Sequence, residues 1–121
     1  MKTGTSELVA EIKGGIISAV KGSGDIATTA MDTITKTART AIEDTAEIGG
    51  DLRDATVGGV TGAIEAAKEL GISAEEAASA AAQGALAAAD KVGGAALQTV
   101  RNAVTGTIAG VKVVLKEPFK K

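Results

Sequence analysis

The chain has 121 residues and a formal net charge of −2, and it contains no cysteine, histidine, tryptophan or tyrosine. This composition excludes disulfides, thiolate or imidazole metal sites, histidine-based catalysis, and the aromatic platforms that bind single-stranded nucleic acid. We therefore expect a protein that is not an enzyme, that needs no cofactor or metal ion, and that binds no nucleic acid.

The first predicted helix covers about residues 6–26, and its pattern weakens near Gly22 and Gly24. The segment from Lys21 to Asp25 is the nearest approach to a glycine-rich phosphate loop. It lacks the preceding strand that such loops require, so a phosphate site is not expected here.

Residues 30–70 carry the clearest helical pattern. At 100° per residue, the apolar and small side chains fall within one arc of roughly 120°, opposite Glu43, Glu47 and Asp51. The arc crosses two Gly-Gly pairs without a change of phase, which predicts one helix about 60 Å long. Whether these pairs are continuous helix or hinges stays open.

Glycines inside this predicted helix each cost about 1 kcal/mol relative to alanine. Gly58, Gly62 and Ala66 form a row of small residues at i, i+4 and i+8, which allows another helix to approach closely. The alternative is local looseness without a packing role. The residues predicted to pack against other helices are Gly49, Gly50, Gly58, Gly59, Gly62, Gly93, Gly94, Gly106 and Gly110.

A helix end and a helix start are predicted between residues 69 and 76. Gly71 suits the position after a helix C-terminus, and Ser73 with Glu76 forms a capping box. Thr29 is a weaker cap of the same kind 44 residues earlier. The third helix is predicted over residues 74–116. Because the turns are short, the expected fold is all-α, a helical hairpin or three-helix arrangement of antiparallel helices completed by oligomerisation.

An internal repeat underlies these helices. Gly-Gly pairs begin at residues 14, 49, 58 and 93, so the first and third pairs, and the second and fourth, are 44 residues apart. Aligning residues 14–57 with 58–101 gives eight identities. We interpret the chain as one domain with a truncated unit (1–26), two full units (27–70 and 71–114) and a basic tail (115–121).

Charge is unevenly distributed along the chain. Residues 37–90 hold three basic and ten acidic residues, whereas residues 91–121 hold six basic and one acidic residue. Antiparallel neighbours with this pattern attract, within one molecule or between copies. The candidate contacts with a protein partner or with acidic lipid are Lys112, Lys116, Phe119, Lys120 and Lys121. A solubilising end is the alternative.

Carboxylates are the remaining candidate reactive groups. Glu43, Glu47 and Asp51 follow one another at i, i+4 and i+8, with Asp54 nearby, a spacing that gathers oxygen ligands for Mg²⁺ or Ca²⁺. One helix face cannot surround an ion, however, so we interpret these residues as a solvated acidic face and expect no metal site.

The segment from Asp54 to Lys68, DATVGGVTGAIEAAK, resembles the eleven-residue Val/Thr/Gly/Ala-rich helices of synucleins. The runs at 36–47 and 74–91 are similar to late-embryogenesis-abundant proteins and to phasins. These resemblances imply association with a lipid or particle surface, or protection during drying.

We expect a non-enzymatic structural or interaction protein that self-associates, or packs on a protein partner, through glycine- and alanine-lined amphipathic helices. The alternatives are reversible association with a lipid or particle surface, with peripheral membrane contact, and a partly disordered stress-protective protein. No signal-peptide pattern and no apolar window of about 18 residues is present, so a cytoplasmic location is expected.

Overall fold

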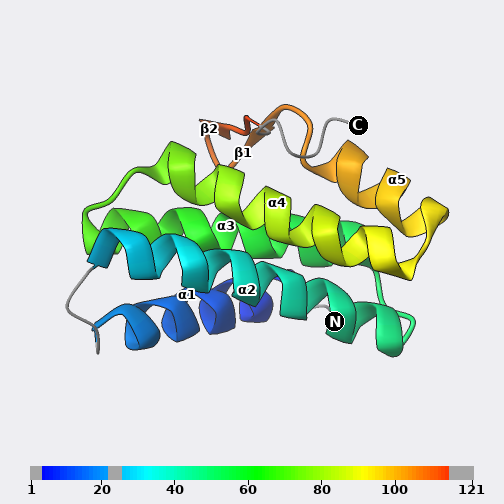
Figure 1. Ribbon diagram of the computed structural model, residues 1–121, viewed down its shortest axis with the longest axis horizontal. Coiled ribbons are helices and arrows are strands. Elements are labelled where there is room, and N and C mark those ends of the chain that lie inside the picture. Colours follow the sequence, from blue (N-terminus) through cyan, green and yellow to red (C-terminus); the bar gives the residue numbers. More distant parts are fainter. Residues whose placement is uncertain (1–3, 22–25, 115–121) are drawn as a thin grey trace.

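Five helices and a short β-hairpin make up the part of the chain that the computed structural model describes, residues 4–21 and 26–114 (Figure 1). In chain order they are α1 (Gly4–Lys21), α2 (Ile26–Glu47), α3 (Leu52–Leu70), α4 (Ala74–Val92), α5 (Gly94–Ala103), β1 (Thr107–Ile108) and β2 (Val111–Lys112). The predicted all-α class is confirmed, because each strand holds only two residues.

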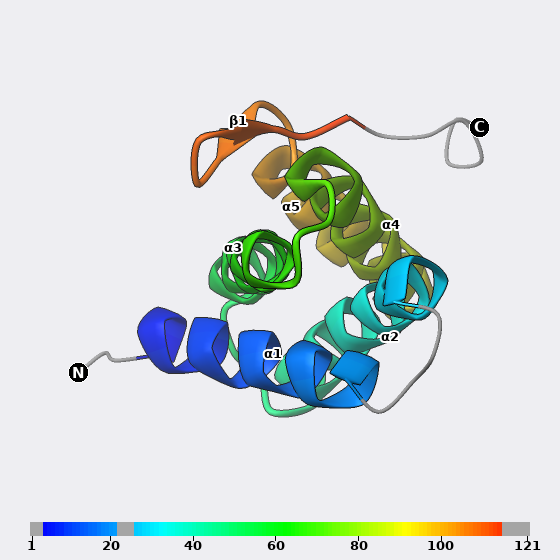
Figure 2. The same ribbon diagram turned by 90° about the vertical axis from the view of Figure 1, so that its left-hand side faces the viewer.

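Successive helices run in opposite directions along the long axis of the molecule (Figure 1). α1 packs chiefly on α3, and α2 packs chiefly on α4, although neither pair is consecutive in the chain. α2 also contacts α3, so it lies against both α3 and α4. α5 and the hairpin cover α3 and α4 on the side away from α1 (Figure 2).

The segment predicted as one helix over residues 30–70 is two helices, α2 and α3, joined by a turn. α2 ends at Glu47 because Gly49 adopts a left-handed conformation, with φ of +72°, that residues with a Cβ rarely take. Asp51 then caps α3, since its carboxylate accepts hydrogen bonds from two backbone N–H groups in the first turn. Asp51 is therefore a capping residue and does not belong to a continuous acidic helix face.

The first predicted helix, over residues 6–26, also has different boundaries. α1 covers Gly4–Lys21, and Ile26 already belongs to α2. The weak cap predicted at Thr29 consequently lies within α2. A single threonine satisfies only one of the unpaired N–H groups of a helix start, so it does not fix where the helix begins.

The segment predicted as one helix over residues 74–116 is interrupted at Gly93 and ends at Ala103. Gly93 has φ of +149°, which an L-residue rarely adopts, and it separates α4 from α5. The hairpin follows, where Ala109 and Gly110 both have positive φ, as a two-residue type I′ turn requires. The β-branched residues on either side of this turn favour extended backbone over helix.

The predicted junction between the second and third helices is confirmed. Gly71 is left-handed, with φ of +78°, and its N–H donates a hydrogen bond to the Ala67 carbonyl. Two residues later, the Ser73 hydroxyl accepts a hydrogen bond of 3.1 Å from the Glu76 N–H. Local capping chemistry thus ends α3 and begins α4 within three residues.

The core consists of aliphatic side chains from all five helices. The largest fully buried ones are Ile16, Val20, Ile34, Ile42, Val60, Ile64, Leu86, Val100 and Val104. Alanine and glycine occupy most buried positions of α3 and α4. Since such small residues add little bulk between helices, the stability of the fold depends on how closely the helix backbones approach.

Candidate functional site

Glycines on α3 form its contact with α1. A Cβ at Gly58 would come within 2.9 Å of Leu8 Cδ2. A Cβ at Gly62 would lie 3.0 Å from both the Ile12 Cβ and the Val9 carbonyl oxygen. The absence of side chains at these two positions is what allows α1 to lie directly on α3.

The residues beside these two glycines are enclosed as well. Gly59 and Ala66 are buried, and a Cβ at Gly59 would make an ordinary contact of 3.7 Å with Ile12 Cδ1. The row of small residues predicted to allow a close helix approach, Gly58, Gly62 and Ala66, therefore coincides with the face of α3 that contacts α1.

The closest helix approach involves Gly84, which the sequence analysis did not single out. A Cβ there would overlap the carbonyl oxygen of Thr35 on α2 and lie 3.0 Å from its carbonyl carbon. The Thr35 hydroxyl lies 3.0 Å from the Met31 carbonyl oxygen of its own helix and 3.3 Å from the Ala80 carbonyl oxygen across the interface, so its one proton can be donated to either. α2 and α4 therefore meet backbone to backbone at this point.

The other six glycines predicted to pack on helices lie at turns or helix ends, which corrects that prediction. They are Gly49, Gly50, Gly93, Gly94, Gly106 and Gly110. A Cβ would meet no atom within 4 Å at five of them, and at Gly50 it would meet only Thr45 in the last turn of α2 and Ile48 just after it. Four of the six have positive φ, so backbone conformation explains them.

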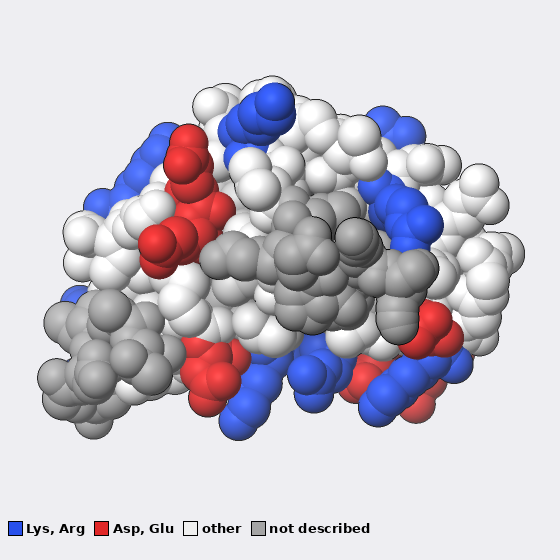
Figure 3. All heavy atoms as spheres, turned by 45° about the horizontal axis from the view of Figure 1, so that its top comes forward, with Lys and Arg blue, Asp and Glu red and all other residues white. Residues whose placement is uncertain are grey.

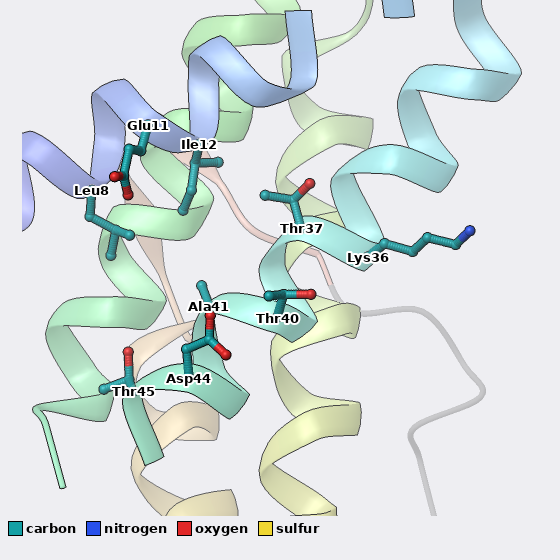
Figure 4. A pocket seen from close by; sticks show the side chains of 9 residues that line it. All are labelled: Leu8, Glu11, Ile12, Lys36, Thr37, Thr40, Ala41, Asp44 and Thr45. Carbon is teal, nitrogen blue, oxygen red and sulfur yellow. The ribbon is translucent and has the colours of Figure 1, made fainter. Parts of the chain in front are cut away.

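A groove lies between α1 and α2, with a volume of about 490 Å³ (Figure 4). It is lined by Leu8, Glu11, Ile12, Lys36, Thr37, Thr40, Ala41, Asp44 and Thr45. Its apolar members, Leu8, Ile12 and Ala41, come from both helices, and the other six lining residues are polar. Such a combination of apolar surface and a few polar groups is typical of sites that bind another molecule.

Charged residues at this groove have a distinct arrangement. Glu11 on α1 and Asp44 on α2 belong to its two walls, while the Lys36 side chain extends away from it (Figure 4). The ion pairs within residues 8–21 and 29–114 are those of Lys13 with Glu65 and Glu69, at 4.0 and 3.3 Å. In that part of the chain, neither carboxylate of the groove has a cation partner.

A second, smaller cavity of about 200 Å³ lies between α2 and α4. Its lining includes Ser79, which is 3% exposed and whose hydroxyl has no hydrogen-bond partner. Thr35, Glu76 and Gln83 supply further polar groups around it. The cavity is therefore a polar gap in an otherwise close helix contact.

The candidate reactive and lipid-contacting residues are not brought together. Within the described ranges, no group of three or more acidic side chains lies close enough to hold a metal ion. Lys112 is exposed on β2. The remaining predicted contacts, Lys116, Phe119, Lys120 and Lys121, lie outside the described residues.

The outer face around α5 and the hairpin shows no single-sign charge patch. Basic and acidic side chains are interspersed over the part that Figure 3 displays. The large apolar side chains most exposed in the described residues are Ile48, Val114 and Val92, of which Ile48 is 82% exposed. Among the helices described, none combines the length and apolar character needed to cross a lipid bilayer.

Comparisons with protein-family models, with curated proteins and with solved structures found no match to this chain.

Proposed function

We propose that this chain is a non-enzymatic structural or interaction protein whose helices bind a protein surface, and that it self-associates. The groove between α1 and α2 carries this proposal. It leaves the half-buried Leu8 and Ala41 partly exposed to solvent, whereas Ile12, which also lines it, is only 5% exposed because it packs on α3. Covering the exposed atoms with a second protein surface would stabilise both.

The 44-residue repeat supports the same proposal. Adding 44 maps most of α1 and α2 onto α3 and α4, so one period of the repeat spans a helix pair, although the units predicted from the sequence (27–70 and 71–114) begin within that period, at α2 and just before α4. Helix pairs that stack in this way bury most of their apolar surface between units. The groove lies between the two helices of the first pair, α1 and α2, and a further contact there would cover it.

The apolar face of α2 is buried in the core, which favours contact with a protein over contact with lipid for the folded chain. Ile34, Ala38 and Ile42 on α2 are at most 3% exposed. A helix that binds a lipid surface must present such a stripe to the lipid, so α2 would first have to leave the core. A groove of small and polar residues demands no such rearrangement from a protein partner.

Sedimentation equilibrium of the purified chain tests self-association, from about 1 μM to about 1 mM protein. We expect a mass that rises with concentration while the far-ultraviolet circular dichroism stays helical. The same spectra with and without anionic vesicles address the lipid alternative, which predicts a change of helicity on addition. A helical monomer at all concentrations would refute self-association.

A further inference from the structure

The surface that forms the α1–α2 groove has a counterpart in the second half of the chain, and that counterpart is covered. Adding 44 to Lys36, Thr40 and Asp44 of α2 gives Ala80, Gly84 and Ala88 of α4. α2 itself lies on this part of α4, with the Thr35 backbone against Gly84 and the Thr35 hydroxyl against Ala80. The repeat thus presents the same helix face twice, once beneath another helix and once open to solvent.

The exposed face of α2 differs in charge from the covered face of α4. Lys36, Thr40 and Asp44 are all exposed and follow one another at i, i+4 and i+8 along α2. Thr40 is the midpoint, with a cation four residues before it and an anion four residues after it. Such a row is complementary to itself when a second copy is turned end over end.

Antiparallel pairing of two α2 helices about Thr40 places opposite charges together. Lys36 of each copy then lies opposite Asp44 of the other, and Thr33 lies opposite Glu47, because each pair is equidistant from Thr40. The carboxylate of Glu11 on the far wall of the groove adds a second anion for the incoming lysine. Threonine and alanine side chains at the centre are small enough for close helix contact.

We propose that two copies of this chain form a two-fold symmetric dimer in which each α2 occupies the groove between α1 and α2 of the other. This inference rests on the proposed self-association and names its surface and its partner, a second copy of this chain. The dimer gives the open helix face the same kind of cover that α2 provides for α4.

Other pairings of two copies are less favourable. In a parallel α2 pair, Lys36 would face Lys36 and Asp44 would face Asp44, so like charges would repel. Continued stacking of helix pairs would require the outer side of α3 and α4, which α5 and the hairpin already cover. The antiparallel dimer avoids the like-charge contacts and leaves the outer side of α3 and α4 unused. Because each copy uses its α2 surface for the other, no surface is left to add a third copy, and we expect dimers but not larger assemblies.

Exchange of the two charges tests this arrangement by sedimentation. Lys36→Glu and Asp44→Lys should each raise the dimer dissociation constant about tenfold, because symmetry turns two attractive pairs into two repulsive ones. The triple variant Glu11→Lys/Lys36→Glu/Asp44→Lys restores opposite charges at both contacts of residue 36 and should return the constant to within about threefold of the original, and the double variant Lys36→Glu/Asp44→Lys should recover part of the loss.

Matched controls separate this effect from net charge and from folding. Asp90→Lys and Lys91→Glu make the same charge changes on an exposed part of α4, and they should leave the dissociation constant unchanged. Thermal melting of each variant, followed by circular dichroism, checks that the helices remain folded.

Cross-linking through a single thiol gives an independent measure. The chain has no cysteine, so Thr40→Cys introduces one thiol at the symmetry axis, where a disulfide needs Cα atoms about 4.4–6.8 Å apart. We expect this variant to form a disulfide dimer on mild oxidation at least about tenfold faster than Thr99→Cys, on the exposed side of α5, at equal concentration.

The outcomes distinguish this inference from the function on which it rests. Recovery of the dimer in the triple variant, with fast cross-linking at residue 40, supports the α2 interface. Self-association without recovery, or with equal cross-linking at residues 40 and 99, overturns the interface and leaves self-association standing. A monomer throughout the concentration range overturns both.

Discussion

The backbone of Thr35 on α2 lies so close to Gly84 on α4 that a methyl group at residue 84 would overlap the Thr35 carbonyl oxygen. α2 and α4 are also each other's main packing partners. The separation of α2 and α4 therefore depends on residue 84 having no side chain. Adding a methyl group at this position is the most direct test of the fold.

Gly84→Ala should lower the free energy of unfolding by about 2 kcal/mol or more, because the atoms that must move belong to the backbone of a packed helix. Urea denaturation followed by circular dichroism measures this. Gly14→Ala is the matched control, since its Cβ would meet nothing within 4 Å. It should raise stability by up to about 1 kcal/mol, and equal effects at the two sites would contradict the close approach.

The two glycines that face α1 should differ in sensitivity to alanine. At Gly58 the new methyl group meets the flexible end of the Leu8 side chain, which can rotate away. At Gly62 it meets the branched Ile12 side chain at its Cβ and the Val9 carbonyl, which cannot. Gly62→Ala should therefore be more destabilising than Gly58→Ala, by about 1 kcal/mol in urea denaturation. The reverse order would show that α1 is displaced more easily than its contacts imply.

Capping by Asp51 should contribute measurably to stability. Asp51→Ala removes the acceptor for two N–H groups at the start of α3, so the free energy of unfolding should fall by about 1 kcal/mol. Asn is a comparable capping residue, and Asp51→Asn should retain most of the stability. Thermal melts of both variants provide the measurement, and similar losses in the two would argue against a capping role.

Ser79→Ala should stabilise the protein. The Ser79 hydroxyl is buried without a hydrogen-bond partner, and its removal relieves a desolvation cost of about 1 kcal/mol. Thr56→Val is the contrasting variant, because the equally buried Thr56 hydroxyl donates a 2.7 Å hydrogen bond to the Leu52 carbonyl. It should destabilise by about 1 kcal/mol. Loss of stability in Ser79→Ala would indicate that a bound water satisfies that hydroxyl.

Some boundaries were predictable from the sequence because they depend on neighbouring residues only. Gly71 and Ser73 end α3 and begin α4 through hydrogen bonds that span a few residues. The division at residue 49 was not predictable from periodicity. The turn over residues 48–51 takes four residues, close to the 3.6 of one helical turn, so the apolar pattern resumes nearly in phase on the next helix.

The contact at Gly84 escaped the sequence analysis for a different reason. It lies in a run of alanines, where every face of the helix carries small side chains, so no pattern distinguishes the residue that faces another backbone. The hairpin did have a local signal, an Ala-Gly pair between β-branched residues, which the helical pattern of the preceding segment obscured.

The groove was not predicted from the sequence. Alternating small and polar residues on α2 were visible in the sequence, but the groove also requires Leu8 and Glu11 from α1. How two helices diverge depends on their contacts with α3 and α4, which lie far along the chain. Neighbouring residues along the chain therefore do not indicate where the groove opens.

The pairing of α1 with α3, and of α2 with α4, has a consequence for how the chain folds. During synthesis, α1 and α2 emerge before either of their main partners exists, so the first half of the molecule lacks most of its stabilising contacts at that stage. Folding has to close loops of many residues before these contacts form, which slows it relative to a helical bundle built from consecutive neighbours. Two separate halves, each a helix pair, are on this basis candidates for assembly by fragment complementation.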